Sequence, residues 1–191
     1  VTMGKVWELT LDQRKVRDGR SYDLVVVDAP ATGHGVGFLQ TPRTFANIAR
    51  VGPMAQQAEA LDAAIHDSPR TGIAVVALPE EMPVNETAAL ERELAEKVGV
   101  EVERIYCNGL YPDRFDAGEV ERLRAEAEGG DGGVRAACRA AVSEADRART
   151  QREQLLRLER SCEAPVTTLP FLFSPDLREA EIGELAELVA G

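Results

Sequence analysis

One short aliphatic run constrains the fold of this chain more than any other feature. Residues 24–27 (Leu-Val-Val-Val) contain no polar side chain and end at Asp28, which a glycine-rich segment follows. An unbroken aliphatic run is typical of a strand covered on both faces, as in a parallel sheet. We therefore expect an α/β fold in which Asp28 stands at the carboxyl end of a buried strand, the edge where open α/β sheets bind ligands.

The rest of the chain alternates short aliphatic runs with helical patterns. Asn85 is a suitable N-cap for one of the helices and Gly99 a suitable stop. The predicted strands are 73–78, 100–107 and 166–169, and the predicted helices are 86–98, 116–128, 134–158 and 176–189. Strand, helix, strand at these lengths predicts a mostly parallel sheet flanked by helices, with right-handed crossovers. We expect residues 1–191 to form a single α/β domain.

Two segments break this alternation. Apolar residues recur at helical spacing over residues 41–65, but Gly52-Pro53 interrupts them, so two helices are expected there. Residues 129–133 (Gly-Gly-Asp-Gly-Gly) form the glycine-rich run, where a flexible segment is expected.

Length and hydropathy are those of a soluble globular protein. A chain of 191 residues buries about 70% of its unfolded surface, enough for a proper core. No run reaches the roughly 20 apolar residues that cross a bilayer, so direct membrane insertion is not expected. The first residues have neither a basic lead nor an apolar core segment, and we expect a cytoplasmic location.

Charge and cysteine usage exclude other classes. The formal net charge of −11 argues against nucleic acid as the main partner, because nucleic acid attracts clustered Lys and Arg. The three cysteines contain no C-x-x-C pair, so free thiols are expected rather than a zinc site or a disulfide framework. With only two histidines, a histidine-rich metal site is not expected either.

Two polar residues at strand ends could carry chemistry. A carboxylate such as Asp28 can hold Mg²⁺, usually through water, while the small residues after it let backbone N–H groups approach a phosphate. Asn108 offers both a donor and an acceptor, which matches the edge of adenine. Asp28 could instead cap the next turn, and Asn108 could simply form a turn with Gly109. His34 is read as a structural or switch-coupled residue rather than a general base.

These residues resemble the strand and second switch loop of the ArsA-type ATPases, P-loop proteins that drive arsenical pumps and target tail-anchored proteins. Asp28 keeps the family spacing to Thr32-Gly33-His34, with the proline displaced by one place. The resemblance covers most of the chain. It continues through Thr41-Pro42-Arg43, Val51-Gly52-Pro53, Leu78-Pro79-Glu80-Glu81, Asn85-Glu86-Thr87 and Cys107-Asn108-Gly109-Leu110.

The resemblance implies a P-loop NTPase-like fold that lacks its first strand and phosphate loop. No G-x-x-x-x-G-K-S/T pattern occurs in the sequence, and Gly4-Lys5 lacks the glycines and hydroxyl of such a loop. We therefore expect the carboxyl-terminal part of an ATPase, which does not hydrolyse ATP by itself.

Roles for individual residues follow from the same resemblance. Residues 28–37 would be the switch loop, in which Asp28 holds a magnesium-bound water while Thr32 and Gly33 face the γ-phosphate of ATP. Asn108 would read the adenine base. The other residues implied on the nucleotide side are Pro170 and Phe171, which would pack on the base, and Glu80. Glu80 could also be a helix cap and Phe171 plain core.

The resemblance also implies partners. A complete subunit would bind Mg·ATP, close against a second copy as a homodimer and reopen after hydrolysis. A membrane pump subunit or a client protein would read this closure through a mobile helical region, residues 41–66. The alternatives are a natural non-catalytic partner or regulatory domain without a P-loop, and an unrelated nucleotide- or phosphate-sensing α/β module.

Overall fold

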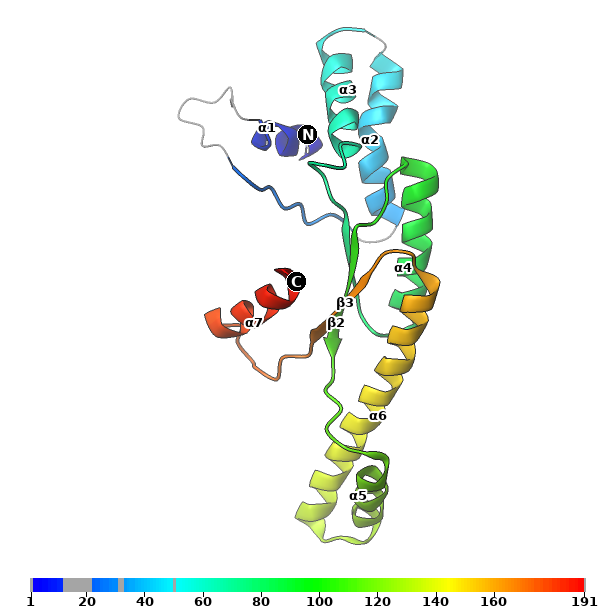
Figure 1. The fold of residues 1–191 in the computed structure, drawn as a ribbon, viewed down its shortest axis with the longest axis vertical. Helices are drawn as coiled ribbons and strands as arrows, with labels where there is room; N and C mark the ends of the chain where they lie inside the picture. Colours follow the sequence, from blue (N-terminus) through cyan, green and yellow to red (C-terminus); the bar gives the residue numbers. More distant parts are fainter. Residues whose placement is uncertain (1, 12–21, 31–32, 50, 191) are drawn as a thin grey trace. The chain divides into compact units, whose positions relative to one another are not determined.

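The computed structural model describes residues 2–11, 22–30, 33–49 and 51–190 (Figure 1). Where the sequence predicts one domain, the described residues divide into two compact units. The sheet unit contains Ala74–Ala88 and the described residues from Glu103 onward. The helical unit contains those up to Ile73 together with Ala89–Val102.

The sheet unit is built on three parallel strands in the order β1-β2-β3. These strands are β1 (Ala74–Ala77), β2 (Arg104–Leu110) and β3 (Val166–Pro170). The predicted parallel sheet with flanking helices is thus confirmed, and it is consistent with a P-loop NTPase-like fold. The bounds of β2 differ from the prediction, since this strand begins at Arg104 and continues beyond Cys107 to pair with β3 as far as Leu110.

The two faces of the sheet are covered unequally. On one face Ile105 and Cys107 are fully buried, and α6 packs against β2. On the other face α7 packs against β3, yet Val76 of β1 stays 66% exposed. Figure 1 shows α6 and α7 on opposite sides of the sheet. Burial, with a smaller contribution from Glu159, raises the pKa of the Cys107 thiol to about 11. None of the three cysteines forms a disulfide.

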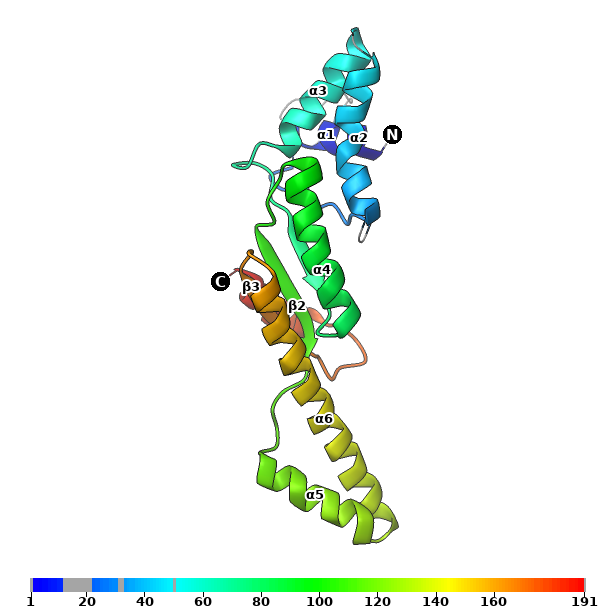
Figure 2. The same ribbon diagram turned by 90° about the vertical axis from the view of Figure 1, so that its right-hand side faces the viewer.

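Two helices of the sheet unit form an antiparallel hairpin, α5 (Ala117–Gly129) and α6 (Gly132–Ser161) (Figure 2). Asp116 and Glu119 make a capping box at the start of α5, and the Asp131 side chain caps α6. The predicted flexible run 129–133 therefore consists of two helix ends with a two-residue turn between them. At Gly130 a Cβ atom would lie 2.7 Å from the carbonyl oxygen of Glu126, so only glycine fits this turn.

The helix after β1 starts earlier than predicted. It comprises α4 (Glu81–Glu93) and the π-helical turn η1 (Leu94–Val98), and it stops at Gly99 with φ +82° as expected. Asn85 lies inside α4, so its predicted role as N-cap is wrong. The helix can begin at Glu81 because Pro83 falls in the first turn, where its missing N–H breaks no hydrogen bond.

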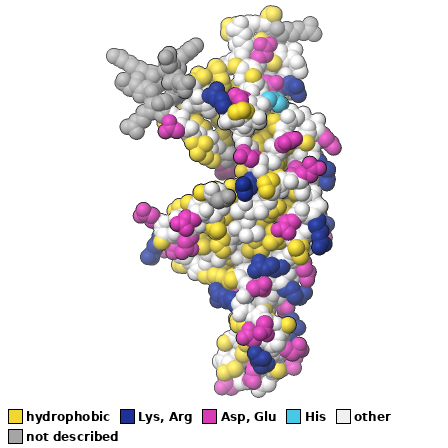
Figure 3. Space-filling model, viewed as in Figure 1, with side chains coloured by type: hydrophobic (Ala, Val, Ile, Leu, Met, Phe, Trp, Pro, Cys, Tyr) yellow, Lys and Arg dark blue, Asp and Glu magenta, His cyan; other side chains and the backbone are white. Residues whose placement is uncertain are grey.

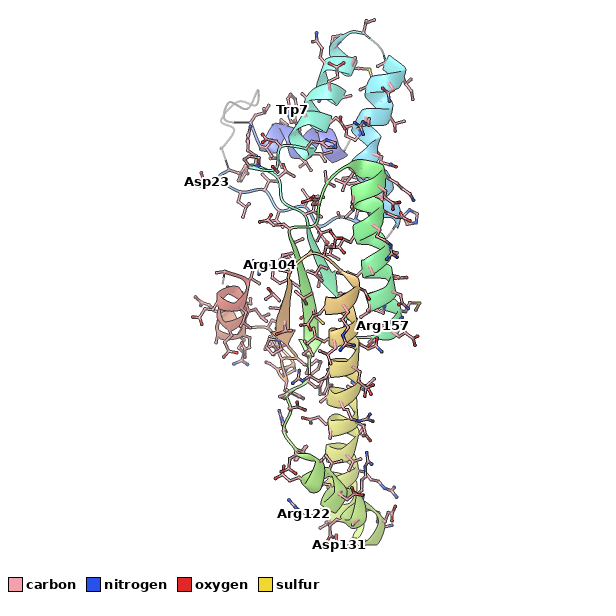
Figure 4. The ribbon with its side chains drawn as sticks, turned by 45° about the vertical axis from the view of Figure 1, so that its right-hand side comes forward. Trp7, Asp23, Arg104, Arg122, Asp131 and Arg157 are labelled. Carbon is pink, nitrogen blue, oxygen red and sulfur yellow. The ribbon has the colours of Figure 1, made fainter. Side chains whose placement is uncertain are left out.

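Asn85 accepts a hydrogen bond from Arg157 of α6 instead of capping its own helix. Arg157 is labelled in Figure 4. Its Nη2 atom lies 2.7 Å from Asn85 Oδ1, and its Nη1 atom lies 3.7 Å from the Glu81 carboxylate. These contacts connect the first turns of α4 to the carboxyl-terminal half of α6, within the sheet unit.

The helical unit contains α1 (Thr2–Leu9), α2 (Gly33–Ala49) and α3 (Pro53–Ile65). α3 packs against both α1 and α2, and α2 also packs against η1. The predicted break at Gly52-Pro53 is confirmed: Gly52 has φ +103° and Pro53 is the first residue of α3. Small side chains such as Ala55 and Ala58 are buried in this unit.

The predicted strand at residues 24–27 is wrong. These residues lie outside regular secondary structure, with Leu24 77% and Val26 83% exposed. A strand needs a hydrogen-bonded neighbour, and the described strands pair only with one another. Within residues 28–37, predicted as a switch loop, α2 begins at Gly33.

Candidate functional site

The carboxyl ends of the parallel strands gather several of the predicted site residues. Glu80 follows β1, Asn108 lies near the end of β2, and Pro170 ends β3. Asn108 pairs in register with Leu169, and the backbone N–H of Phe171 donates to the carbonyl oxygen of Leu110 at 2.8 Å. The structure therefore brings Asn108, Pro170 and Phe171 together at one sheet edge.

A bulge shapes the end of β2 at this edge. The register with β3 shifts between Asn108 and Leu110, and Gly109 between them has φ +82°. This left-handed conformation favours glycine, because a Cβ atom would be strained there. Asn108 thus lies within β2, directly before a bend. The sequence had predicted that the strand ends before Asn108.

Gln151 of α6 holds the bulge from the helix side. Its Nε2 atom donates to the carbonyl oxygen of Gly109 at 3.2 Å, and its Oε1 atom accepts the backbone N–H of Tyr111 at 2.8 Å. The residue is only 9% exposed, so both ends of a buried amide are satisfied by the two backbone groups.

The Asn108 carboxamide itself is free to bind. The side chain is half-buried, and within the part of the chain that the structure describes it makes no hydrogen bond. An amide in this position offers two donor hydrogens and one acceptor oxygen. These are the groups needed to recognise the polar edge of a planar base.

An aromatic cluster, defined as Tyr111, Phe171 and Phe173, lies beside the bulge. The Tyr111 and Phe171 rings stack with centroids 4.6 Å apart and planes at 25°. Phe173 meets both rings edge-on, at 5.4 and 4.9 Å. Phe171 and Phe173 are 39% and 51% exposed, so the cluster presents aromatic surface to solvent instead of filling the core.

Two arginines flank this cluster. The guanidinium of Arg114 lies 4.6 Å from the centroid of Phe173, and that of Arg147 lies 5.2 Å from the centroid of Tyr111. Arg147 also donates to the Tyr111 hydroxyl at 3.2 Å. Both arginines are exposed, so each contact contributes about 0.5–1 kcal/mol. Together the groups form a flat apolar surface with positive charge at its border.

The remaining predicted site residues lie elsewhere. Glu80 is exposed, and its carbonyl oxygen accepts the N–H of Val84 at the start of α4, which agrees with the alternative reading of a helix cap. In the helical unit Asp28 is exposed, Gly33 opens α2 and His34 is exposed on its first turn. Thr32 falls outside the described residues.

Gly35, rather than Gly33, is the sterically constrained glycine of the predicted switch segment. A Cβ atom on Gly35 would lie 2.6 Å from the carbonyl oxygen of Pro30, whereas one on Gly33 would meet nothing within 4 Å. The close approach places the backbone of Pro30 against the first turn of α2.

Among the described residues, no group of three or more His, Cys, Asp or Glu side chains could hold a metal ion. A single carboxylate still suits Mg²⁺, which commonly uses one or two carboxylates beside water and phosphate oxygens. Asp28, exposed and outside regular structure, fits such a role by its chemistry.

The helical unit has a polar cluster of its own around His66, the C-cap residue of α3. The ring atom Nδ1 lies 2.7 Å from the carbonyl oxygen of Asp62, and Nε2 lies 2.8 Å from that of Val98. These two backbone carbonyls raise the pKa of His66 above 6.5; burial opposes the shift, the Asp62 carboxylate adds to it, and Arg43 reduces it.

The surface cavities among the described residues include two that are not lined by any predicted site residue. One, of about 460 Å³, lies between α5 and α6, and the other, of about 380 Å³, lies between α2 and α3 beside His66. On the face shown in Figure 3, acidic and basic side chains are interspersed rather than gathered into a basic patch. No described helix has the length and apolar character to cross a membrane.

Sequence reasoning missed Tyr111, Phe173, Gln151 and the two arginines. Tyr111 and Phe173 stand within two or three positions of predicted residues, so an aromatic residue soon after each strand was an available signal. Gln151 lies about forty residues from its backbone partners. No local pattern distinguishes it from the other polar residues of a long charged helix.

Comparisons with known proteins relate part of this chain to ATPases. Residues 46–129 match the family described as anion-transporting ATPase, ArsA type. ATPase BagA of Mycobacterium tuberculosis and an ATPase-named protein of Mycobacterium bovis are each 37% identical to this chain over 95 residues. That match covers 49% of this chain and 27% of each relative, so the chain spans about a quarter of their length. Glu80 and Asn108 lie inside the matched segment.

Proposed function

We propose, from the premise that residues 46–129 are a segment of the ArsA-type, anion-transporting ATPase family, that the sheet unit binds the adenine base of ATP. The observation that carries this proposal is that the unpaired Asn108 carboxamide and the exposed aromatic cluster belong to the same carboxyl edge of the parallel sheet. Ligands of open α/β sheets bind at that edge. In this arrangement the amide reads the base edge and the rings receive its face.

The amide of Asn108 can discriminate between purines. Adenine presents a donor amine next to a ring acceptor, and a carboxamide pairs with both through its oxygen and its N–H₂ group. Guanine places an acceptor where adenine has its donor, which leaves one buried polar group of the pair unmatched. An unmatched buried polar group costs about 1–3 kcal/mol.

The aromatic cluster supplies a surface for stacking. Phe171 keeps 39% of its area exposed, and Pro170 beside it is exposed as well. Stacking of a base on an aromatic side chain contributes about 1–3 kcal/mol and tolerates any base. Affinity therefore comes mainly from the rings and selectivity mainly from Asn108.

The family resemblance would give Asp28, Thr32 and Gly33 roles toward the phosphates, and Glu80 a role near the nucleotide. In a complete subunit, joined to a segment with a glycine-rich lysine loop, these groups would face Mg²⁺ and the γ-phosphate during ATP hydrolysis. Mg²⁺ would supply charge stabilisation for the transferred phosphoryl group. Closure as a homodimer, read by a pump subunit or a client protein through residues 41–66, completes the proposal.

Nuclear magnetic resonance tests the base site on the chain itself. Adenosine and guanosine, which carry no phosphate, are titrated separately while the backbone amide of residue 108 is followed, because Asn108→Ala retains this signal. Adenosine should shift this signal at millimolar concentration, and guanosine should bind about tenfold more weakly. Asn108→Ala should weaken adenosine binding about tenfold, whereas Asn47→Ala, on exposed α2, should not change it. Equal binding of both nucleosides would contradict the role of Asn108.

A further inference from the structure

The backbone of residues 109–111 is held on two sides by groups far apart in the sequence. β3 holds Leu110 through the N–H of Phe171 at 2.8 Å, and α6 holds Gly109 and Tyr111 through the amide of Gln151. The bulge is therefore fixed at three consecutive residues. Asn108 directly precedes this fixed segment, and the Tyr111 ring directly follows it.

The side chain of Gln151 has the donor and the acceptor that its two backbone partners need. One partner is a carbonyl oxygen and the other an N–H, so a neutral carboxamide satisfies both with one donor and one acceptor. Being 9% exposed, its amide has little access to water, and removal of the side chain would leave both backbone groups without this partner. The two hydrogen bonds of Gln151 thus oppose relaxation of Gly109 from its left-handed conformation to another one.

We infer that Gln151 is a positioning residue for the base site. Through its two backbone hydrogen bonds it sets the orientation in which Asn108 and Tyr111 meet a purine. It reaches no ligand itself, because its amide is occupied by the backbone. This inference rests on the proposed function, since it assigns Gln151 to the adenine site named above.

The variant Gln151→Glu separates the hydrogen bonds of this side chain from its packing, because the two side chains have nearly the same shape. In Gln151→Glu the ionised carboxylate still accepts the N–H of Tyr111 but faces the carbonyl oxygen of Gly109 with no proton to donate. The protonated acid has both a donor and an acceptor, as the amide does. The variant should therefore be impaired near about pH 8 and regain function toward about pH 5, because burial raises the pKa of a carboxyl group.

The experiment measures two properties of the full chain, hydrogen exchange at the Tyr111 amide and adenosine binding at Asn108. Gln151→Leu should speed exchange at Tyr111 and weaken adenosine binding, each about tenfold. Gln154→Leu is the matched control. It removes the same amide from the same helix, and Gln154 Oε1 is buried without a donor among the described residues. This control should change neither property.

Each outcome has a definite meaning. Faster exchange and weaker binding in Gln151→Leu, with rescue of Gln151→Glu at low pH, supports the inference. Faster exchange with unchanged binding overturns it, and so does unchanged exchange. If wild-type chain shows no adenosine shift at all, the proposed base site fails, and the exchange data alone then decide whether Gln151 clamps the bulge.

Discussion

The sheet unit and the helical unit each anchor a backbone turn with one long-range side chain, but the two side chains differ in kind. In the sheet unit Gln151 bonds one carbonyl oxygen and one N–H. In the helical unit His66 faces two carbonyl oxygens, those of Asp62 and Val98. An amide has a donor and an acceptor at every pH, whereas an imidazole has two donors only when it is protonated.

This difference predicts that only one of the two anchors responds to pH. Neutral His66 could donate to one of its carbonyls and would turn a lone pair toward the other. The protonated ring donates to both, and both carbonyls lie at the negative ends of helices, in α3 and η1. The anchor of the helical unit is therefore sensitive to pH above 6.5, while that of the sheet unit is not.

The chain offers a separate probe for each unit. Trp7, the single tryptophan, belongs to the helical unit, in α1 packed against α3. The three cysteines belong to the sheet unit. Tryptophan fluorescence during urea unfolding thus reports the helical unit, and the rate of thiol labelling reports the sheet unit.

The largest effect is expected in the core of the sheet unit. Leu158 on α6 is fully buried, and Leu158→Ala should lower the free energy of unfolding by about 2–5 kcal/mol. Labelling of buried Cys107 should then begin at a lower urea concentration. Leu156→Ala, at a position 49% exposed on the same helix, should change it by less than about 1 kcal/mol. Equal shifts for the two variants would contradict a core that depends on Leu158.

The bulge should be the next most sensitive feature. Gly109 has φ +82°, and Gly109→Ala forces a Cβ atom into a left-handed conformation, which should destabilise the sheet unit by about 1–2 kcal/mol. Gly129→Ala, at the end of α5 where a Cβ atom would meet nothing, should leave stability unchanged or raise it slightly. Thiol-labelling midpoints in urea measure both. If Gly109→Ala is neutral, the bulge is not rigid enough to position Asn108.

The elements of the sheet unit could be predicted because their signals are local. An aliphatic run marks β1, and short segments rich in β-branched residues that end at Asn108 and Pro170 mark β2 and β3. The helix-length connections between the three favour parallel pairing. The start of α4 was misplaced because Asn85 is a good cap by type. Glu81 and Pro83 also suit a first turn, and nothing local decides between the two starts.

Residues 24–27 show what a local pattern leaves out. An aliphatic run indicates that burial is favourable, but it does not show which strand would pair with it. The described strands pair only among themselves. In the candidate site, Asn108, Pro170 and Phe171 could be named because they directly follow the predicted strands and lie in segments that resemble an ATPase family. Gln151 could not, since its role depends on contacts across about forty residues.

The pH response of the helical unit sharpens the comparison directly. Because the folded pKa of His66 lies above 6.5, its stabilisation is fully present below pH 6.5 and is lost as pH rises through the folded pKa. His66→Gln should lower stability by about 1 kcal/mol at low pH and flatten this dependence. Trp7 fluorescence in urea at several pH values measures it, with His34→Gln as the control. A pH dependence that survives in His66→Gln would assign it to another group.

The smallest effect is expected at Gln40, which bonds the end of η1 next to His66. Gln40 of α2 donates to the carbonyl oxygen of Lys97 at 3.0 Å, one residue before the carbonyl that His66 bonds. The contact is exposed, so Gln40→Ala should cost only about 0.5 kcal/mol. Replacing a helical glutamine by alanine also changes helix propensity, and Gln56→Ala on exposed α3 measures that part separately. The difference between the two variants should not depend on pH, since an amide does not titrate. If it follows the pH dependence of His66, the two side chains act as one coupled anchor rather than as two independent ones.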